Sequence, residues 1–158
     1  MKIKTTLLVV KDIQKSKQFY SELFDMHIEM DAGANIELSG GLSLQTADSW
    51  GKFINKEESD IVFANNASEI YFEIDDMNSF KEKLNSIPDI VYLQPLTEQP
   101  WGQMSMRFCD FDGHIIEVGE NLSMTVKRFL DSGLSIDDIA IRMDVDVDFI
   151  NKLLSESN

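Results

Sequence analysis

Short apolar runs and helical periodicity alternate along the chain, and the pattern occurs twice. Residues 4–24 are typical of an apolar strand, an acidic turn and an amphipathic helix, with Asp12 in place to cap the helix. Residues 68–87 show the same pattern, with Asp76 in the place of Asp12. Such self-similarity indicates two copies of one structural unit.

The second half of each unit also repeats. Residues 39–46 (SGGLSLQT) and 111–118 (FDGHIIEV) each predict a glycine turn followed by a strand, and this alignment puts Gln45 at the position of Glu117. Further short strands are expected at 26–30 and 35–39 in the first unit, and at 91–95 and 104–108 in the second. Each unit is therefore predicted to be β-α-β-β-β.

These units define the predicted fold class and the domain limits. We expect an α+β domain over residues 1–120, in which two paired βαβββ units form a curved mixed sheet around a cleft. Residues 121–158 are expected to form a small C-terminal helical extension. The polar connector at 49–67 is expected to be a loop over the surface or over a pocket.

Glu117 poses the main chemical question, because it stands in mid-strand between apolar neighbours. An isolated buried carboxylate is costly unless it is paired, neutralised or bound to a metal. Thr5 and Glu69 are equivalent in the first strands of the two units, as Gln45 and Glu117 are in the last strands. If the two units face each other, these four polar side chains converge on one point. Otherwise Glu117 faces water.

The composition narrows the choice of partners and compartment. A net charge of −14 argues against nucleic acid and anionic membranes, because both bind positive surfaces. The single cysteine, Cys109, allows no internal disulfide and fits a reducing cytoplasm. The acidity also favours a cationic ligand. We interpret Arg107 as a surface or salt-bridged arginine rather than as a binder of an anionic substrate.

The extension after residue 120 predicts a helix closed by Gly133, followed by two short helices, the first with a capping signal at Ser135. The last two resemble the helix-turn-helix of small regulators. The final helix opens with the acidic run DVDVD, which phosphates would repel. A packing role is therefore expected, in which the extension covers a sheet, joins a dimer or caps the pocket.

Three stretches together resemble the vicinal oxygen chelate superfamily, which includes glyoxalase I, bleomycin-resistance proteins, fosfomycin-resistance enzymes and extradiol dioxygenases. They are LLVVKDIQKSKQFYSELF, EIYFEIDDM and PWGQMSMRFCDFDGHIIEVGE. The last is similar to the family's Pro-Trp-Gly and Asp-Pro-Asp-Gly ending, with Phe111 where proline is usual. The resemblance covers residues 3–120 and implies the paired βαβββ fold and a homodimer.

The resemblance also implies a metal-dependent enzyme of the glyoxalase type, a lyase or isomerase acting on a small oxygen-rich molecule. Its metal ligands would be Gln45, Glu69 and Glu117, with Glu117 also serving in acid–base catalysis. Two carboxylates and an amide oxygen suit Mn²⁺ or Mg²⁺ better than Zn²⁺. Ni²⁺ and Zn²⁺ are the other candidates. Thr5 stands at the fourth family position and is a poor ligand.

The alternative is a metal-free protein that sequesters a small molecule, as the bleomycin-resistance branch does. It needs no cofactor, and Glu117 would then form part of a binding pocket. Pockets are mostly apolar with a few polar groups. The candidate lining residues for either activity are Thr5, Leu7, Trp50, Tyr71, Trp101 and Met106.

Overall fold

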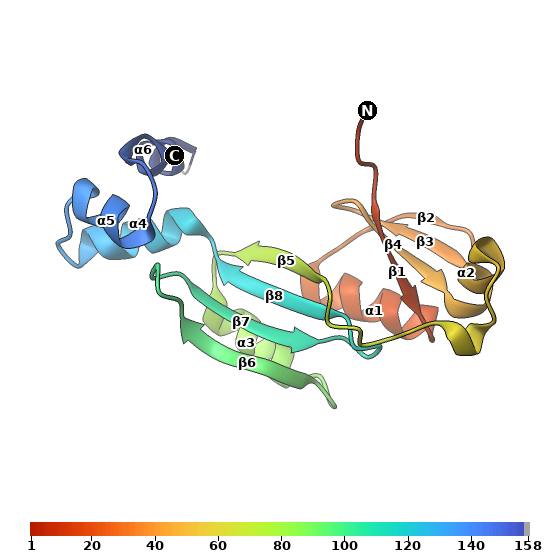
Figure 1. Cartoon of the computed structure of the whole chain (residues 1–158). Coiled ribbons are helices and arrows are strands. Elements are labelled where there is room, and N and C mark those ends of the chain that lie inside the picture. Colours follow the sequence, from red (N-terminus) through yellow and green to blue (C-terminus); the bar gives the residue numbers. More distant parts are fainter. Residues whose placement is uncertain (157–158) are drawn as a thin grey trace. The chain divides into compact units, whose positions relative to one another are not determined.

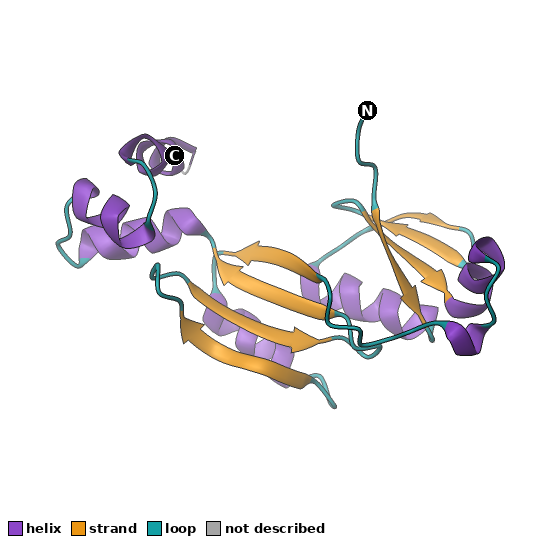
Figure 2. Cartoon of the chain, viewed as in Figure 1, coloured by secondary structure: helices purple, strands orange, loops and turns teal. Residues whose placement is uncertain are grey.

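The computed structural model describes residues 1–156, which fold into two compact units, each with a four-stranded sheet (Figures 1 and 2). The first unit comprises Met1–Ser68 with Ile87–Ile90 and Cys109–His114. The second comprises the other described residues. The predicted α+β class is confirmed.

The first unit has the predicted β-α-β-β-β order. Its elements are β1 (Thr6–Val10), α1 (Ile13–Phe24), β2 (Ile28–Asp31), β3 (Asn35–Leu38) and β4 (Leu42–Thr46). The strand order is β1-β4-β3-β2, with β1 parallel to β4 and the other pairs antiparallel. Apolar residues of β1, β3 and β4 are buried with Phe19, Tyr20 and Leu23 of α1, so that this helix and sheet form the core of the unit.

The second unit repeats this arrangement and confirms the internal repeat. Its corresponding elements are β5 (Glu69–Ile74), α3 (Met77–Asn85), β6 (Val91–Glu98), β7 (Met104–Cys109) and β8 (Ile115–Glu120). The strand order β5-β8-β7-β6 matches that of the first sheet, and β5 is parallel to β8. The ring of Phe80 of α3 lies 6.3 Å from that of Phe108 of β7, which shows the face of the sheet on which α3 packs.

The first helix of each unit begins at the aspartate that the sequence predicts. Asp12 accepts hydrogen bonds from the backbone N–H groups of Gln14 and Lys15, and Asp76 does the same for Asn78 and Ser79. These bonds satisfy N–H groups that would have no partner at a helix start.

Removing either cap should therefore have the same effect in the two units. Asp12→Ala and Asp76→Ala are each expected to lower the free energy of unfolding by about 1 kcal/mol. Urea denaturation followed by circular dichroism measures the loss. Glu82→Ala, at an exposed position within α3, is the control. A cap variant that matches this control would show that its cap contributes nothing.

The parallel strand pairs revise one part of the predicted alignment. Leu7 pairs with Ser43 in the first unit, whereas Tyr71 pairs with Glu117 in the second. When the helix caps are aligned, Leu7 corresponds to Tyr71, so Ser43 rather than Gln45 is the backbone counterpart of Glu117. The hairpin loop before the last strand is longer in the second unit, and its extra length produces this shift by one strand pleat.

The connector is not the continuous loop that was expected. It contains the helix α2 (Ala47–Ile54) and the short 3-10 helix η1 (Glu58–Asp60). Ala47 and Gly51 are buried, and α2 lies against β4 and β1. Glycine, serine and aspartate have low helix propensities, so that packing on the sheet rather than local preference stabilises this helix.

The extension forms three helices, as predicted, and belongs to the second unit. They are α4 (Leu122–Asp131), α5 (Ile136–Met143) and α6 (Val147–Glu156). Gly133 follows α4 in the left-handed conformation, and Ser135 and Asp138 form the predicted capping box of α5. The helices bury a common core of Val126, Phe129, Ile139, Ala140, Met143 and Ile150. None of the helices within residues 1–156 has the length and apolar character needed to cross a membrane.

Candidate functional site

Glu117 is buried and paired with an arginine. Its side chain is 8% exposed, and its Oε2 accepts a hydrogen bond of 2.6 Å from Nη2 of Arg107 on the neighbouring strand β7. A charge-assisted bond of this length is among the stronger polar contacts in proteins. The structure thus explains the mid-strand carboxylate by an ion pair, and it confirms Arg107 as a salt-bridged arginine.

The same arginine also binds Glu69. Its Nε lies 3.1 Å from Oε2 of Glu69, and its Nη1 donates to Oε1 of Gln94 at 2.8 Å. Alternate residues of a strand face the same side of a sheet, so Glu69 and Tyr71 of β5 share a face with Glu117, which pairs with Tyr71. One guanidinium therefore holds two carboxylates on the face of the sheet opposite the buried core.

The environment of Glu117 changes its acidity. Burial raises the pKa of Glu117 above its usual value, while the Arg107 guanidinium and a hydrogen bond from Ser105 lower it and the Glu69 carboxylate raises it. Burial is the largest of these effects, so that the pKa of Glu117 is higher in the folded protein than in the unfolded chain.

This pKa shift predicts a pH dependence of stability with a definite sign. Because the folded-state pKa of Glu117 is raised, its contribution to the free energy of unfolding should grow as the pH falls from neutrality towards about 4.3, the ordinary pKa of a glutamate. Urea denaturation of the wild type and of Glu117→Gln over this range isolates that contribution, since the other titrating groups cancel. A difference between the two proteins that does not change with pH would contradict the assignment.

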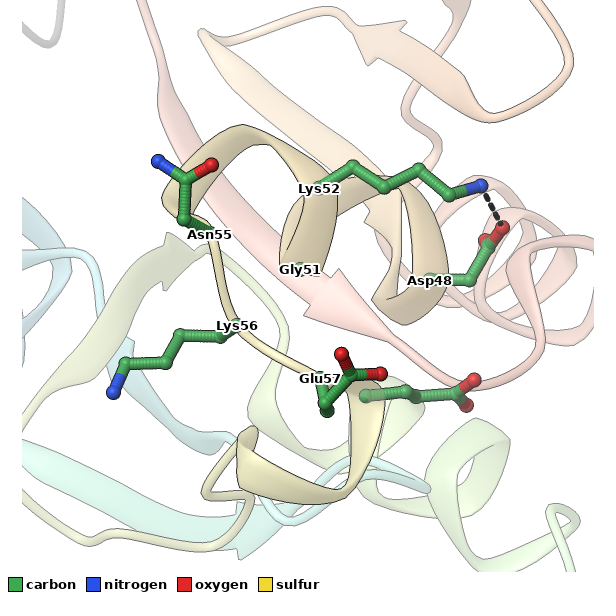
Figure 3. A pocket seen from close by; sticks show the side chains of 7 residues that line it. Asp48, Gly51, Lys52, Asn55, Lys56 and Glu57 are labelled. Carbon is green, nitrogen blue, oxygen red and sulfur yellow. Dashed lines mark hydrogen bonds and ion pairs between the residues drawn. The ribbon is translucent and has the colours of Figure 1, made fainter.

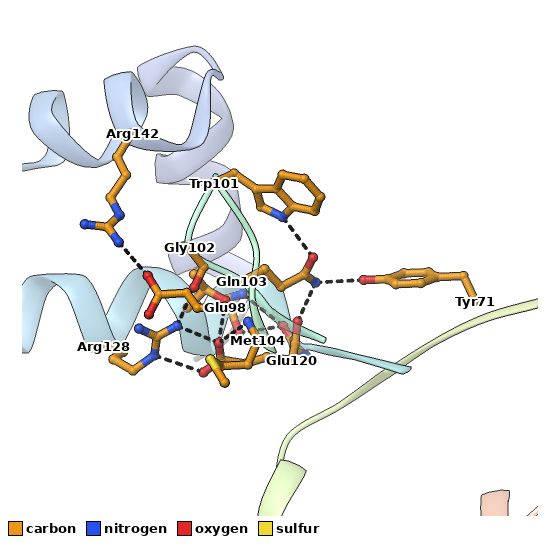
Figure 4. A network of polar contacts seen from close by, with 12 residues as sticks. Tyr71, Glu98, Trp101, Gly102, Gln103, Met104, Glu120, Arg128 and Arg142 are labelled. Atoms are coloured by element: carbon orange, nitrogen blue, oxygen red, sulfur yellow. Dashed lines mark hydrogen bonds and ion pairs between the residues drawn. The ribbon is translucent and has the colours of Figure 1, made fainter. Parts of the chain in front are cut away.

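Two exposed aromatic rings, one of them that of Tyr71 beside Glu117, are fixed by one buried amide (Figure 4). Gln103 is 4% exposed, donates to the hydroxyl of Tyr71 at 2.8 Å and accepts from the indole Nε1 of Trp101 at 3.0 Å. Tyr71 is 45% exposed and Trp101 is 37% exposed. A Cβ at Gly119 would lie 2.8 Å from the Tyr71 hydroxyl, so the glycine is what leaves room for this ring.

Tyr71 is held as a neutral phenol. Burial raises the pKa of Tyr71 to about 12, and the Glu73 carboxylate, which accepts the hydrogen bond of its hydroxyl at 3.0 Å, contributes in the same direction. The group is therefore not a base at neutral pH, and because its O–H is donated to Glu73 it offers a ligand its aromatic face.

The candidate residues of the first unit have partners of their own. The Thr5 hydroxyl lies 2.7 Å from that of Ser43, and Gln45 accepts from Asn35 at 2.8 Å and donates to Ser49 at 2.6 Å. Gln45 is buried, so both ends of its amide are used inside the unit. Leu7 on β1 and Trp50 on α2 are partly buried. Their part in a pocket stays a prediction.

Met106 does not join Tyr71 and Glu117. It is fully buried on β7 and neighbours Arg107 in sequence, so that its side chain points to the α3 face of the sheet. There it lines a cavity of about 240 Å³ with Tyr92 of β6 and Lys81 and Asn85 of α3. Met106 is thus part of the core of the second unit.

A larger hollow of about 700 Å³ lies beside α2 in the first unit (Figure 3). It is lined by Asp48, Gly51, Lys52, Asn55, Lys56, Glu57 and Glu58. Lys52 and Asp48 form an exposed ion pair of 3.2 Å within it. Its lining mixes both signs of charge, and the Lys52–Asp48 ion pair within it is exposed to solvent and of a kind that contributes little energy. The second-unit face is therefore the better candidate site.

Comparison with known proteins identifies the family. The model of the glyoxalase-like domain matches residues 3–123. The chain belongs to the glyoxalase-like domain family. This match and the structural neighbours confirm the resemblance to the vicinal oxygen chelate superfamily. No curated protein matches the chain in sequence.

This glyoxalase-like chain aligns with most of the length of several solved structures. A protein of unknown function from Agrobacterium tumefaciens str. C58 is 30% identical over 76% of this chain and 94% of its own, with a TM-score of 0.66. A glyoxalase-related enzyme from Fulvimarina pelagi is 19% identical over 77% and 89%, with a TM-score of 0.65. A lactoylglutathione lyase from Agrobacterium tumefaciens is 22% identical over 75% and 92%, with a TM-score of 0.53. The last two likenesses show the fold alone.

The two carboxylates that the family pattern implies as ligands, Glu69 and Glu117, do not fit a divalent metal in this glyoxalase-like chain. Glu69 and Glu117 share one guanidinium, whose N–H groups already occupy the Oε2 atom of each carboxylate that a metal would need. The amide of Gln45 is used by Asn35 and Ser49. Within residues 1–156, no group of three or more His, Cys, Asp and Glu side chains is placed to hold a metal ion.

Sequence reasoning missed Gln103 as a functional residue. The signal was present, because polar residues recur at 103, 105 and 107 with the period of a strand that shows one polar face. Gln103 precedes β7, where its neighbours across the sheet could not be assigned before the register was known.

Proposed function

We propose that this glyoxalase-like chain binds a small cationic, planar molecule on the open face of its second sheet, without a divalent metal. The observation that carries the proposal is Arg107, which lies between Glu69 and Glu117 where the family pattern implies a metal. The function is then sequestration of a small molecule rather than chemistry that needs a Lewis acid.

The charges on this face support a cationic ligand. Arg107 pairs with Glu69 and Glu117, while Glu73 on the same face of β5 accepts from the Tyr71 hydroxyl, so three carboxylates accompany one guanidinium and the face carries an excess of negative charge. The exposed ring of Tyr71 adds a face with a negative quadrupole, to which cations are attracted.

The aromatic rings support a planar ligand. Tyr71 and Trp101 keep exposed surface although their polar atoms are bonded to Gln103, so that each ring is held in place before a ligand arrives. A rigid side chain loses less conformational entropy on binding than a free one. Stacking between such rings and a flat cation is the expected mode of binding.

A calorimetric titration with 1-methylquinolinium in the presence of EDTA tests this function, with neutral quinoline at pH 8 as the matched control. We expect the cation to bind and quinoline to bind about tenfold more weakly, a difference of about 1.4 kcal/mol. Tyr71→Ala and Trp101→Ala should each weaken binding. Binding that appears only after a divalent metal is added, or no preference for the cation, would contradict the proposal.

A further inference from the structure

The three-helix extension is fastened to the loop that carries Trp101. Phe129 of α4 is buried in the core of the extension and packs directly on Gly102, where an added Cβ would lie only 2.1 Å from the Cζ of its ring. Gly102 has a positive φ of 91° and stands between Trp101 and Gln103. The extension thus contacts the backbone between Trp101, one of the two rings, and Gln103, which fixes both.

Arg128 of α4 adds hydrogen bonds to the contact between the extension and this loop (Figure 4). Its Nη2 donates to the carbonyl oxygen of Gly102 at 2.6 Å and to Oε2 of Glu120 at 2.8 Å, and its Nε lies 3.3 Å from Oε1 of Glu120. Thr125 of α4 donates to the same carboxylate at 2.9 Å. Because both carboxylate oxygens are held in a fork, the contact fixes orientation as well as distance.

Glu120 connects Arg128 to Tyr71 and Trp101 through Gln103. It ends β8, its backbone carbonyl accepts from Nε2 of Gln103 at 2.7 Å, and its carboxylate accepts from the backbone N–H of Met104 at 3.3 Å. The same Nε2 donates to the Tyr71 hydroxyl. Burial raises the pKa of Glu120, but the hydrogen bonds from Arg128 and Thr125 outweigh it, so the group is ionised at neutral pH.

We propose that the extension positions the ligand-binding rings, with Arg128 and Gln103 as the positioning residues. This inference rests on the proposed function and adds a role for α4–α6 to it. Gln103 uses its amide oxygen for Trp101 and its amide nitrogen for Tyr71 and Glu120, so one side chain orients both rings. Arg128 holds the loop on which this amide stands.

The chain offers a matched control in the same extension. Arg142 of α5 forms an ion pair of 2.5 Å with Glu98, and both side chains are more than two-fifths exposed. Arg142 also lies over the Phe129 ring, 4.5 Å from its centroid, as Arg128 does at 5.1 Å, so Arg142→Gln removes the same charge and the same kind of ring contact but neither hydrogen bond to Gly102 or Glu120. If the extension only stabilised the fold, Arg128→Gln and Arg142→Gln would change the environment of Trp101 to the same extent.

The test uses the fluorescence of Trp101 in the full chain with Trp50→Phe, which leaves Trp101 as the single tryptophan. We expect Arg128→Gln and Gln103→Leu each to raise the acrylamide quenching of Trp101 and to weaken 1-methylquinolinium binding about tenfold. Arg142→Gln should change neither. Arg128→Lys, which reaches one of the two acceptors, should fall between. Circular dichroism confirms that each variant is folded.

Equal quenching in Arg128→Gln and Arg142→Gln would overturn the inference. If the wild type does not bind the probe at all, the proposed function fails, while the quenching comparison still decides whether the extension positions Trp101. If the probe binds equally to all variants, the proposed function stands and the positioning role is wrong.

Discussion

Replacing Arg107 by methionine is expected to lower the free energy of unfolding by about 3 kcal/mol at neutral pH, because Glu117 would be left buried without its cation. Methionine keeps the length of the aliphatic part of the side chain and removes only the charge and the donors. The loss should shrink as the pH falls, since a protonated Glu117 no longer needs a counter-ion. Urea denaturation at pH 7.5 and pH 5 measures both effects.

Two variants make this result specific to the ion pair. Arg107→Met combined with Glu117→Gln should recover most of the stability, because the double change removes the buried charge together with its partner. Arg142→Met breaks an exposed ion pair and a cation–π contact with Phe129, and should cost no more than about 1 kcal/mol. A loss in Arg107→Met that is no larger than the loss in Arg142→Met would show that the buried pair does not stabilise the sheet.

Gly102→Ala is expected to have an effect of similar size, with a loss of about 3 kcal/mol. The added methyl group would overlap the ring of Phe129, and an alanine would also have to adopt a φ of 91°. Phe129 is packed in the core of α4–α6 and cannot withdraw without opening that core. Urea denaturation gives the loss, and Trp101 fluorescence shows whether the loop moves with it.

Gly133→Ala separates the two causes, since Gly133 has nearly the same φ but has no atom within 4 Å of an added Cβ. It should lose only the conformational part, about 1 kcal/mol. The difference between the two variants measures how firmly the extension is packed on the loop. Equal losses would mean that Phe129 moves aside freely and that the packing at Gly102 is loose.

The repeat and the helix starts could be predicted because they depend on local rules. Asp12 and Asp76 act on N–H groups two and three residues away, and the glycine turns need only their own backbone freedom. The helix α2 was missed for the opposite reason. Its residues have weak helix propensity, and burial against β1 and β4 decides its structure.

The site could be predicted only in part. Glu117 was identified as a carboxylate that needs a partner, but its partner is set by the alignment of β7 with β8, which no local pattern determines. The longer hairpin loop of the second unit likewise moved the counterpart of Glu117 from Gln45 to Ser43, a shift of one pleat. The packing of Phe129 on Gly102 joins residues distant in sequence and depends on the shape of the loop.

The most direct test of the central claim is the metal content of the wild-type protein, purified without chelator or histidine tag. With Arg107 holding Glu69 and Glu117, elemental analysis should find no stoichiometric metal. Added Mn²⁺, Ni²⁺, Zn²⁺ or Fe²⁺ should not raise the melting temperature. Near-stoichiometric metal that is lost in Glu117→Ala would contradict the account and return Glu117 to the role of a metal ligand.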